Sequence, residues 1–238
     1  MPKTLAIIPA RGGSKRVPNK NVKLMGGIPL IAHTILAAKQ SVKVDKIIVS
    51  TDSDVLMNVA KEYGAEAPFK RPENLALDDT PDKPVLRHAV EWVRENTSLD
   101  PHRIVILRPT SPLRTVEDID HLLAYFDKND FDSVRSVNRV HGVHHPYWMY
   151  RRDGNGLAQP VIEGVTLEEY YRSQLLPEIF RLNGLVDVVK TSVLFQEGPL
   201  YGQKVGICES SVSNSPDIDT IEDFEYVEYL ISKRNEAN

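Results

Sequence analysis

The chain has 238 residues, a formal net charge of −4 and a single cysteine, Cys208. Proteins that bind the phosphates of nucleic acids carry a basic excess, which this chain lacks, so we expect no nucleic-acid partner. The sequence has no apolar run of about 18 residues, so we expect no membrane span. One cysteine excludes an intrachain disulfide and fits a reducing, cytoplasmic location.

Short apolar runs alternate with helix-like stretches through the first two-thirds of the chain. We expect strands at residues 5–9, 46–50, 66–69, 103–107 and 133–137. The helices expected among them cover residues 29–40, 53–63, 84–95 and 116–126. Apolar strands separated by helices indicate an α/β fold with a mostly parallel sheet covered on both faces. Ligands bind beyond the carboxyl ends of such strands, so the candidate loops follow Ile8, Ser50 and Leu107.

Residues 140–181 interrupt this pattern with crowded histidine, tyrosine, tryptophan and arginine side chains. We expect an irregular or β-rich insertion rather than another βαβ unit. A zinc site is the alternative for His141, His144 and His145, but their spacing matches no standard site and no cysteine lies near them. We therefore favour a surface for a second subunit or a substrate. The remaining elements would complete one domain over residues 1–238: a strand at 184–189, a helix at 219–233 and a frayed end at 234–238.

The loop after the first strand is rich in glycine and positive charge. Gly12 and Gly13 allow backbone amides to approach an anion closely, and Ser14 can donate a hydrogen bond. Four cations lie within ten residues: Arg11, Lys15, Arg16 and Lys20. This composition suits a triphosphate, although no P-loop or dinucleotide-binding pattern can be written here. The alternative from composition alone is a solvated basic turn.

Residues 7–21 read IIPARGGSKRVPNKN and closely resemble the signature loop of the cytidylyltransferases that activate sialic acids and related nonulosonic acids. Five further blocks resemble this family in its order and at its spacing: VSTDS (49–53), RPENLALDDT (71–80), LRPTSPLRT (107–115), FRLNG (180–184) and DIDT (217–220). The resemblance implies a Rossmann-like nucleotide-sugar transferase fold, with the insertion packed against a second subunit in a homodimer. It also implies transfer of CMP from CTP to the anomeric hydroxyl of an acidic sugar, with release of pyrophosphate.

The resemblance also assigns roles to residues. Lys20, Arg11 and Asp219 are the expected catalytic residues, with Lys20 offsetting the charge that grows on the leaving pyrophosphate. The resemblance places Arg71 at the nucleotide, and the alternative is an arginine in a surface salt bridge. The residues expected to bind the nucleotide are Arg11, Gly12, Gly13, Ser14, Lys20, Asn21, Arg71 and Arg108.

Asp217 and Asp219 are the expected ligands of a magnesium cofactor (Mg²⁺). In an extended segment, residues two apart point to the same side, so both carboxylates could reach one ion. Mg²⁺ prefers oxygen ligands and keeps several waters. The alternative is that these aspartates cap a helix that starts near Ile221.

For the sugar acid, the resemblance points to Asn183 and to an arginine of the insertion such as Arg172, which could pair with the substrate carboxylate. Sialic-acid enzymes often carry an arginine one place later, where this chain has Ser173.

Arg108 is a second departure, because many members of the family have a glutamine there that contacts the cytosine. An arginine fork suits the N3 and O2 acceptors of cytosine, but it suits guanine equally well. Some legionaminic-acid enzymes resemble this chain in LRPTSP and LDDTPD, so we favour a legionaminic-type acceptor. Three alternatives stay open: another acceptor such as an eight-carbon sugar acid or a phosphonate, GTP as the donor, and a catalytically silent nucleotide-binding protein.

Overall fold

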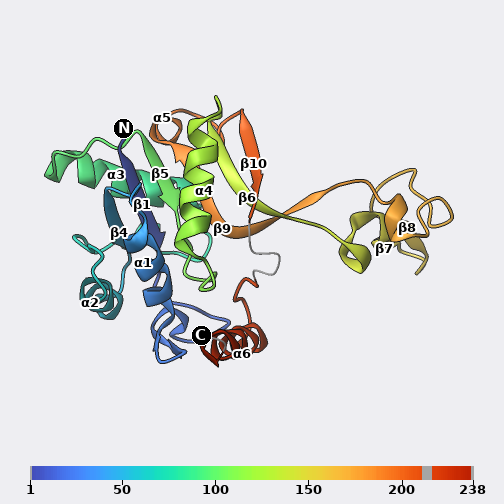
Figure 1. Ribbon diagram of the computed structural model, residues 1–238, viewed down its shortest axis with the longest axis horizontal. Coiled ribbons are helices and arrows are strands. Elements are labelled where there is room, and N and C mark those ends of the chain that lie inside the picture. Colours follow the sequence, from blue (N-terminus) through green and yellow to red (C-terminus); the bar gives the residue numbers. More distant parts are fainter. Residues whose placement is uncertain (1, 211–215, 237–238) are drawn as a thin grey trace.

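The computed structural model describes residues 2–210 and 216–236, which form a six-stranded central sheet in the order β10-β6-β9-β5-β1-β4 (Figure 1). Neighbouring strands are parallel except at β9, which runs antiparallel to both β5 and β6. The mostly parallel α/β sheet expected from the sequence is therefore confirmed. The strands are β1 (Thr4–Pro9), β4 (Lys46–Ser50), β5 (Arg103–Ile106), β6 (Ser133–Arg139), β9 (Phe180–Lys190) and β10 (Val205–Glu209).

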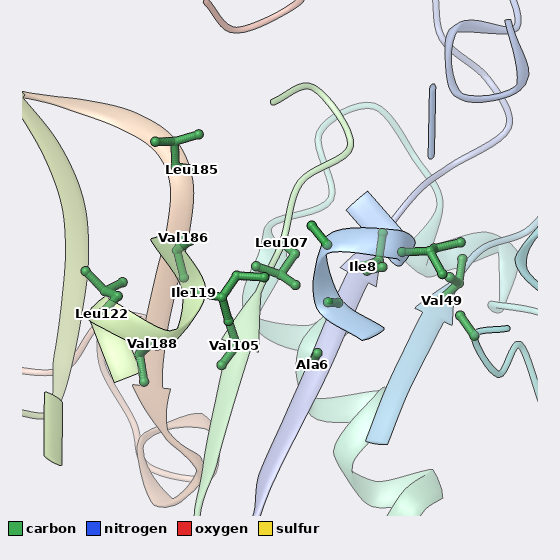
Figure 2. Packing of buried hydrophobic residues seen from close by; sticks show 14 of the residues in the cluster. Ala6, Ile8, Val49, Val105, Leu107, Ile119, Leu122, Leu185, Val186 and Val188 are labelled. Atoms are coloured by element: carbon green, nitrogen blue, oxygen red, sulfur yellow. The ribbon is translucent and has the colours of Figure 1, made fainter. Parts of the chain in front are cut away.

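Helices cover both faces of the sheet because successive strand residues point to opposite sides. In β1, Ala6 and Ile8 belong to one buried cluster, whereas Leu5 and Ile7 belong to another. The first cluster packs against α1 (Leu30–Gln40), α2 (Asp54–Glu62) and α4 (Val116–Asp127). Figure 2 shows part of it, with the side chains of β1 and β4 on one side and those of α4 and β9 on the other. The second cluster packs against α3 (Asp82–Asn96) and α5 (Thr191–Leu194).

A third buried cluster joins the C-terminal helix α6 (Ile221–Glu236) to a small hairpin near the N-terminus. The hairpin consists of β2 (Leu24–Met25) and β3 (Ile28–Pro29), and it lies beside α6 at the bottom of Figure 1. The members of this cluster are Met25, Leu30, Leu113, Ile218, Phe224, Val227 and Ile231. This packing places the segment before α6 next to the loop that follows β1.

The insertion forms an arm that stands away from the sheet on the right of Figure 1. It leaves the end of β6 and returns into β9, and its regular part is an antiparallel pair of β7 (Tyr150–Arg152) and β8 (Ala158–Pro160). The remaining ordered turns are the 3-10 helices η3 (Gly142–His144), η4 (Pro146–Trp148) and η5 (Ser173–Leu175). An irregular insertion was expected, but β9 begins at Phe180, inside the expected boundary.

Several elements differ from the sequence-based expectations. The strand expected at 66–69 is reduced to isolated bridges at Glu66 and Lys70, because Pro68 between them has no N–H to donate. Pro29 ends β3 and precedes α1 instead of lying in the first helical turn. The closing helix extends to Glu236, beyond the expected end at 233, and residues 237–238 of the expected frayed end lie outside the described residues. Within the described residues, no helix is long and apolar enough to cross a membrane.

Gly26 gives a test of how α6 is docked. It has a φ of 57°, and a Cβ atom there would lie 2.7 Å from Cγ2 of Ile231. We expect Gly26→Ala to lower the free energy of unfolding by about 1–3 kcal/mol, from backbone strain plus the clash. In an Ile231→Ala background the clash is absent, so the same change should cost less. Urea denaturation of the four proteins in this double-mutant cycle measures the difference.

Gly27 is the matched control for this cycle. Its φ is 88°, but nothing lies within 4 Å of the place that a Cβ atom would take, so Gly27→Ala should show the backbone cost alone. Equal costs for Gly26→Ala with and without the Ile231 side chain would contradict the proposed contact.

Candidate active site

A pocket of about 280 Å³ opens beyond the carboxyl ends of β1 and β5. It is lined by the loop after β1, by the stretch between Arg71 and the first turn of α3, and by the loop after β5. Of the three candidate loops, those after Ile8 and Leu107 both line this pocket, whereas the described residues in its wall include none from the loop directly after Ser50. The polar residues in its wall are Arg11, Ser14, Lys20, Asn21, Arg71, Asp78, Thr80, Asp82, Arg108 and Thr110.

The loop after β1 is held from behind by the loop after β4. The Gly12 amide donates to Oδ1 of Asp52 at 2.8 Å, and the Asn21 side chain donates to the Arg11 carbonyl oxygen at 3.1 Å. A Cβ at position 12 would lie 3.0 Å from Cβ of Ser53, so the close approach favours glycine. The Gly12 amide therefore holds the loop in this structure rather than pointing at an anion. Gly13 has open space around it.

Three of the four cations of this loop are paired with carboxylates. Arg11 and Lys15 each form an ion pair with Asp78, and Arg16 pairs with Asp219 at 3.0 Å. Hydrogen bonds from Lys15 and Arg11 lower the pKa of Asp78. Arg11 and Asp78 both line the pocket. An anion that enters the pocket therefore competes with Asp78 for the N–H donors of Arg11 and Lys15. Arg11 lines the pocket, whereas the side chains of Lys15 and Arg16 are 79% and 70% exposed, as a solvated basic turn would have them.

Lys20 connects the loop to the segment before α6. Its ammonium donates to the carbonyl oxygen of Ile218 at 2.6 Å. Burial lowers the pKa of Lys20, and the nearby carboxylates of Asp219 and Asp217 oppose this shift. A partly desolvated ammonium interacts with a phosphate more strongly than one in bulk water. Lys20 is thus placed to contact both an anion in the pocket and the region of the two aspartates.

Asp217 and Asp219 are exposed on either side of Ile218, which is fully buried. Neither caps α6. That role belongs to Thr220, whose hydroxyl accepts from the Asp223 amide at 3.2 Å, while the Asp223 carboxylate accepts from the amides of Thr220 and Asp219. The expectation that Asp219 caps the helix is therefore wrong, because Asp223 supplies the carboxylate instead. Both Asp217 and Asp219 keep side chains that can bind a cation.

A metal ion held by Asp217 and Asp219 would need further ligands besides these two carboxylates. Within the described residues, no group of three or more histidine, cysteine, aspartate or glutamate side chains could hold a metal ion. Mg²⁺ is commonly held by one or two carboxylates, with substrate phosphates and water completing its shell. The pair Asp217 and Asp219 beside a pocket lined with cations fits that donor set.

Arg71 is buried, not a surface salt-bridge residue as the alternative interpretation had it. Its Nε donates to the Ser50 hydroxyl at 3.1 Å, and Nη2 bonds to the Ser50 carbonyl oxygen at the end of β4. Burial lowers the pKa of Arg71. Arg71 contributes to the pocket wall from a fixed position.

Arg108 lies between two carboxylates that sequence reasoning did not single out. Its Nη2 pairs with Asp82 in the first turn of α3, and its Nη1 donates to Oδ2 of Asp187 on β9 at 3.0 Å. Asp187 is 2% exposed, and its Oδ2 also accepts a hydrogen bond from the Tyr201 hydroxyl at 2.7 Å. Asp82 belongs to the LDDTPD segment, so its motif was visible in the sequence, but its pairing with Arg108 depends on the fold.

The two residues expected at the sugar acid lie elsewhere. Asn183 is buried in β9, where its Oδ1 accepts from the Ser136 hydroxyl at 2.6 Å and its Nδ2 donates to Asn138 and Ser210. Arg172 is exposed on the arm, with its guanidinium 5.0 Å from the Tyr171 ring centroid. Neither lines the pocket described above.

Comparison with known proteins agrees with this architecture. The cytidylyltransferase family model matches residues 5–236. CMP-N,N'-diacetyllegionaminic acid synthase of Legionella pneumophila is 36% identical over 98% of both chains. The enzyme of the same name from Campylobacter jejuni is 32% identical, covering 99% of this chain and 97% of that protein. The solved structure of CMP:2-keto-3-deoxy-manno-octonic acid synthetase complexed with CTP has a TM-score of 0.72 at 19% identity, covering 98% and 99% of the two chains.

The pairing of Asp78 leads to a prediction about anion binding. Asp78→Asn removes the charge that competes for Arg11 and Lys15, so we expect a nucleoside triphosphate to bind about three- to tenfold more tightly without metal. Isothermal titration calorimetry measures the change. Asp54→Asn is the matched control, since Asp54 pairs with Lys70 at 2.7 Å outside the pocket. Weaker binding by Asp78→Asn would mean that Asp78 supports the site rather than competing with its ligand.

Proposed function

Since the chain belongs to the cytidylyltransferase family, we propose that it transfers CMP from CTP to the anomeric hydroxyl of a nonulosonic acid and releases pyrophosphate. The observation that carries this proposal is the pocket lined by Arg11 and Lys20, together with the position of Lys20, whose ammonium interacts with the carboxylates of Asp219 and Asp217. Full-length identity of 36% to a CMP-N,N'-diacetyllegionaminic acid synthase supports a legionaminic-type acceptor.

In this proposal the residues of the pocket act mainly by position and charge. The triphosphate displaces Asp78 from Arg11 and Lys15, and the Ser14 hydroxyl donates to a phosphate oxygen. The sugar hydroxyl attacks the α-phosphorus in line with the leaving pyrophosphate. Lys20, held by the Ile218 carbonyl oxygen, offsets the charge that develops there. Phosphoryl-type transfer needs little more from the protein than this placement.

We further propose that Asp217 and Asp219 hold Mg²⁺ when nucleotide is bound. Bound there, the ion would offset phosphate charge and help activate the sugar hydroxyl. Arg16 pairs with Asp219 in this structure and would have to release that carboxylate.

The arm supports a proposed homodimer. It stands apart from the sheet (Figure 1) and exposes large apolar side chains, including Val143, Leu157, Tyr171 and Leu175. Such side chains are stabilised when a second surface covers them. Arg172 is exposed on the same arm, next to Tyr171. A cytoplasmic location is proposed as well, in line with the single cysteine.

Pyrophosphate release tests the reaction and its acceptor together. The protein is incubated with Mg²⁺, each of the four ribonucleoside triphosphates and, in turn, N-acetylneuraminic, legionaminic, pseudaminic and eight-carbon sugar acids. We expect release with CTP and a nine-carbon acid. Lys20→Ala, or Asp217→Ala with Asp219→Ala, should reduce the rate about 100-fold or more, because each removes charge stabilisation.

Lys61→Ala is the control for this assay, because Lys61 lies on the exposed side of α2 away from the pocket. Release with GTP in place of CTP would show that Arg108 has changed the choice of base. Binding of CTP without release in any mixture would favour the silent nucleotide-binding protein.

Sedimentation velocity tests the dimer. We expect a dimer at micromolar concentration, and we expect Leu157→Asp combined with Leu175→Asp to yield monomers, because charges would then lie in the covered surface. Val42→Asp is the control, since Val42 is 93% exposed on the body of the protein. A wild-type monomer, or a dimer unaffected by the arm substitutions, would contradict the proposal.

A further inference from the structure

The ion pairs at the pocket fall into two sets that have no residue in common within the described residues. One set joins Arg11 and Lys15 to Asp78, and Arg16 to Asp219, and it belongs to the loop after β1. The other contains Arg108, which pairs with Asp82 and Asp187. The pocket wall also holds apolar residues, of which Val85 follows Asp82 by three residues in α3 and Pro109 follows Arg108 directly. The first set suits phosphates, and the second suits a flat, partly apolar ring that carries polar atoms on its edge.

Asp82 presents an acceptor to this pocket. It is the first residue of α3, and its Oδ2 pairs with Nη2 of Arg108. For its second oxygen, Oδ1, no donor is found among residues 2–210 and 216–236, and the side chain is 39% exposed. Because Asp82 lines the pocket, Oδ1 can accept a hydrogen bond from a ligand there.

Arg108 is held firmly beside it. Asp187, which anchors Nη1, also accepts from Nε of Arg135 at 3.1 Å and from the Tyr201 hydroxyl. Burial and the charge of Asp187 raise the pKa of Tyr201 to about 12, so its hydroxyl keeps its proton and stays a donor. Arg114 fixes the backbone as well, donating to the Arg108 carbonyl oxygen at 2.7 Å. Arginine has five N–H donors, and the two ion pairs leave others for a ligand.

We infer that Asp82 and Arg108 together read the base, with Asp82 accepting from the exocyclic amine of cytosine and Arg108 donating to its N3. This inference rests on the proposed function and names the residues that select its nucleotide. An acceptor beside a donor matches the cytosine edge, which offers the N4 amine as a donor beside the N3 acceptor. Uracil reverses both groups, since it offers the O4 acceptor and the N3–H donor. Adenine has the same edge as cytosine, so ATP is excluded by its second ring rather than by this pair.

Selection of the base therefore depends on Asp82 as much as on Arg108. An arginine alone would suit the acceptors of cytosine, uracil and guanine alike. A carboxylate beside it places negative charge against O4 of uracil, which costs binding free energy because neither group can donate to the other. With Asp82 beside it, Arg108 therefore binds cytosine in preference to uracil.

Isothermal titration calorimetry with CTP and UTP, without an acceptor sugar, tests this inference. We expect the wild-type protein to prefer CTP. Asp82→Asn should reduce the ratio of CTP to UTP affinity about tenfold, because the carboxamide can donate to O4 of uracil. Asp79→Asn is the matched control: Asp79 is exposed, three residues away and absent from the pocket wall, so the ratio should not change.

Arg108→Lys is a second variant in case Asp82→Asn does not fold, which a thermal melt would show. It keeps a positive charge between Asp82 and Asp187 but loses the fork, and the CTP preference should fall as well. A ratio unchanged in these variants, or a wild-type protein that binds UTP as tightly as CTP, would overturn the inference and leave the transfer reaction standing. Pyrophosphate release from no triphosphate, despite selective binding of CTP, would instead overturn the proposed function alone.

Discussion

The hydrogen bond from Lys20 to the carbonyl oxygen of Ile218 joins the beginning of the chain to its end, across 198 residues. It depends on the third buried cluster, in which Ile218 and Phe224 pack against Met25 of the β2–β3 hairpin. Burial of Ile218 leaves the residues on either side of it exposed, and this brings Asp217 and Asp219 next to Lys20. The site is therefore completed by apolar packing of a C-terminal helix rather than by the central sheet itself.

Charge compensation is the second constraint on the site. Burying or crowding cations without partners is costly, so the pocket carries carboxylates beside each group of cations. Asp78 forms ion pairs with Arg11 and Lys15, and Asp187 forms ion pairs with Arg108 and Arg135. The two carboxylates differ in burial, since Asp78 is exposed and Asp187 is buried. An exposed partner can be exchanged for a phosphate at low cost, whereas a buried one is a permanent part of the framework.

Sequence reasoning predicted what depends on local pattern. The apolar run KIIVS at β4 and the helical pattern of α2 are short-range signals, and the expected strand at 46–50 and helix at 53–63 match β4 and α2 within one residue at each end. The edge strand β10 was not predicted, because Val205 and Ile207 are exposed and only alternate positions are buried, which leaves no continuous apolar run.

The carboxylates of the pocket were missed for a different reason. An aspartate in a loop or a strand has no local feature that names its partner, and the ion pair of Arg108 with Asp187 spans 79 residues. The resemblance to a family located the cations, because they lie in contiguous motifs. Their counter-charges come from three separate segments of the chain, so their roles follow only from the folded arrangement.

In the proposed enzyme, the arrangement also separates recognition of the nucleotide from recognition of the acceptor. Every residue that lines the pocket comes from the body of the protein, between Pro9 and Thr110. Arg172 and the exposed Val143, Leu157, Tyr171 and Leu175 lie on the arm, which continues from β6 and leads into β9. Substitutions of these residues therefore remove no member of the ion pairs at the pocket. In the proposed enzyme, acceptor choice can change through the arm and its partner subunit while the residues that bind CTP stay the same, which suits a family whose members share a nucleotide but differ in their sugar acid.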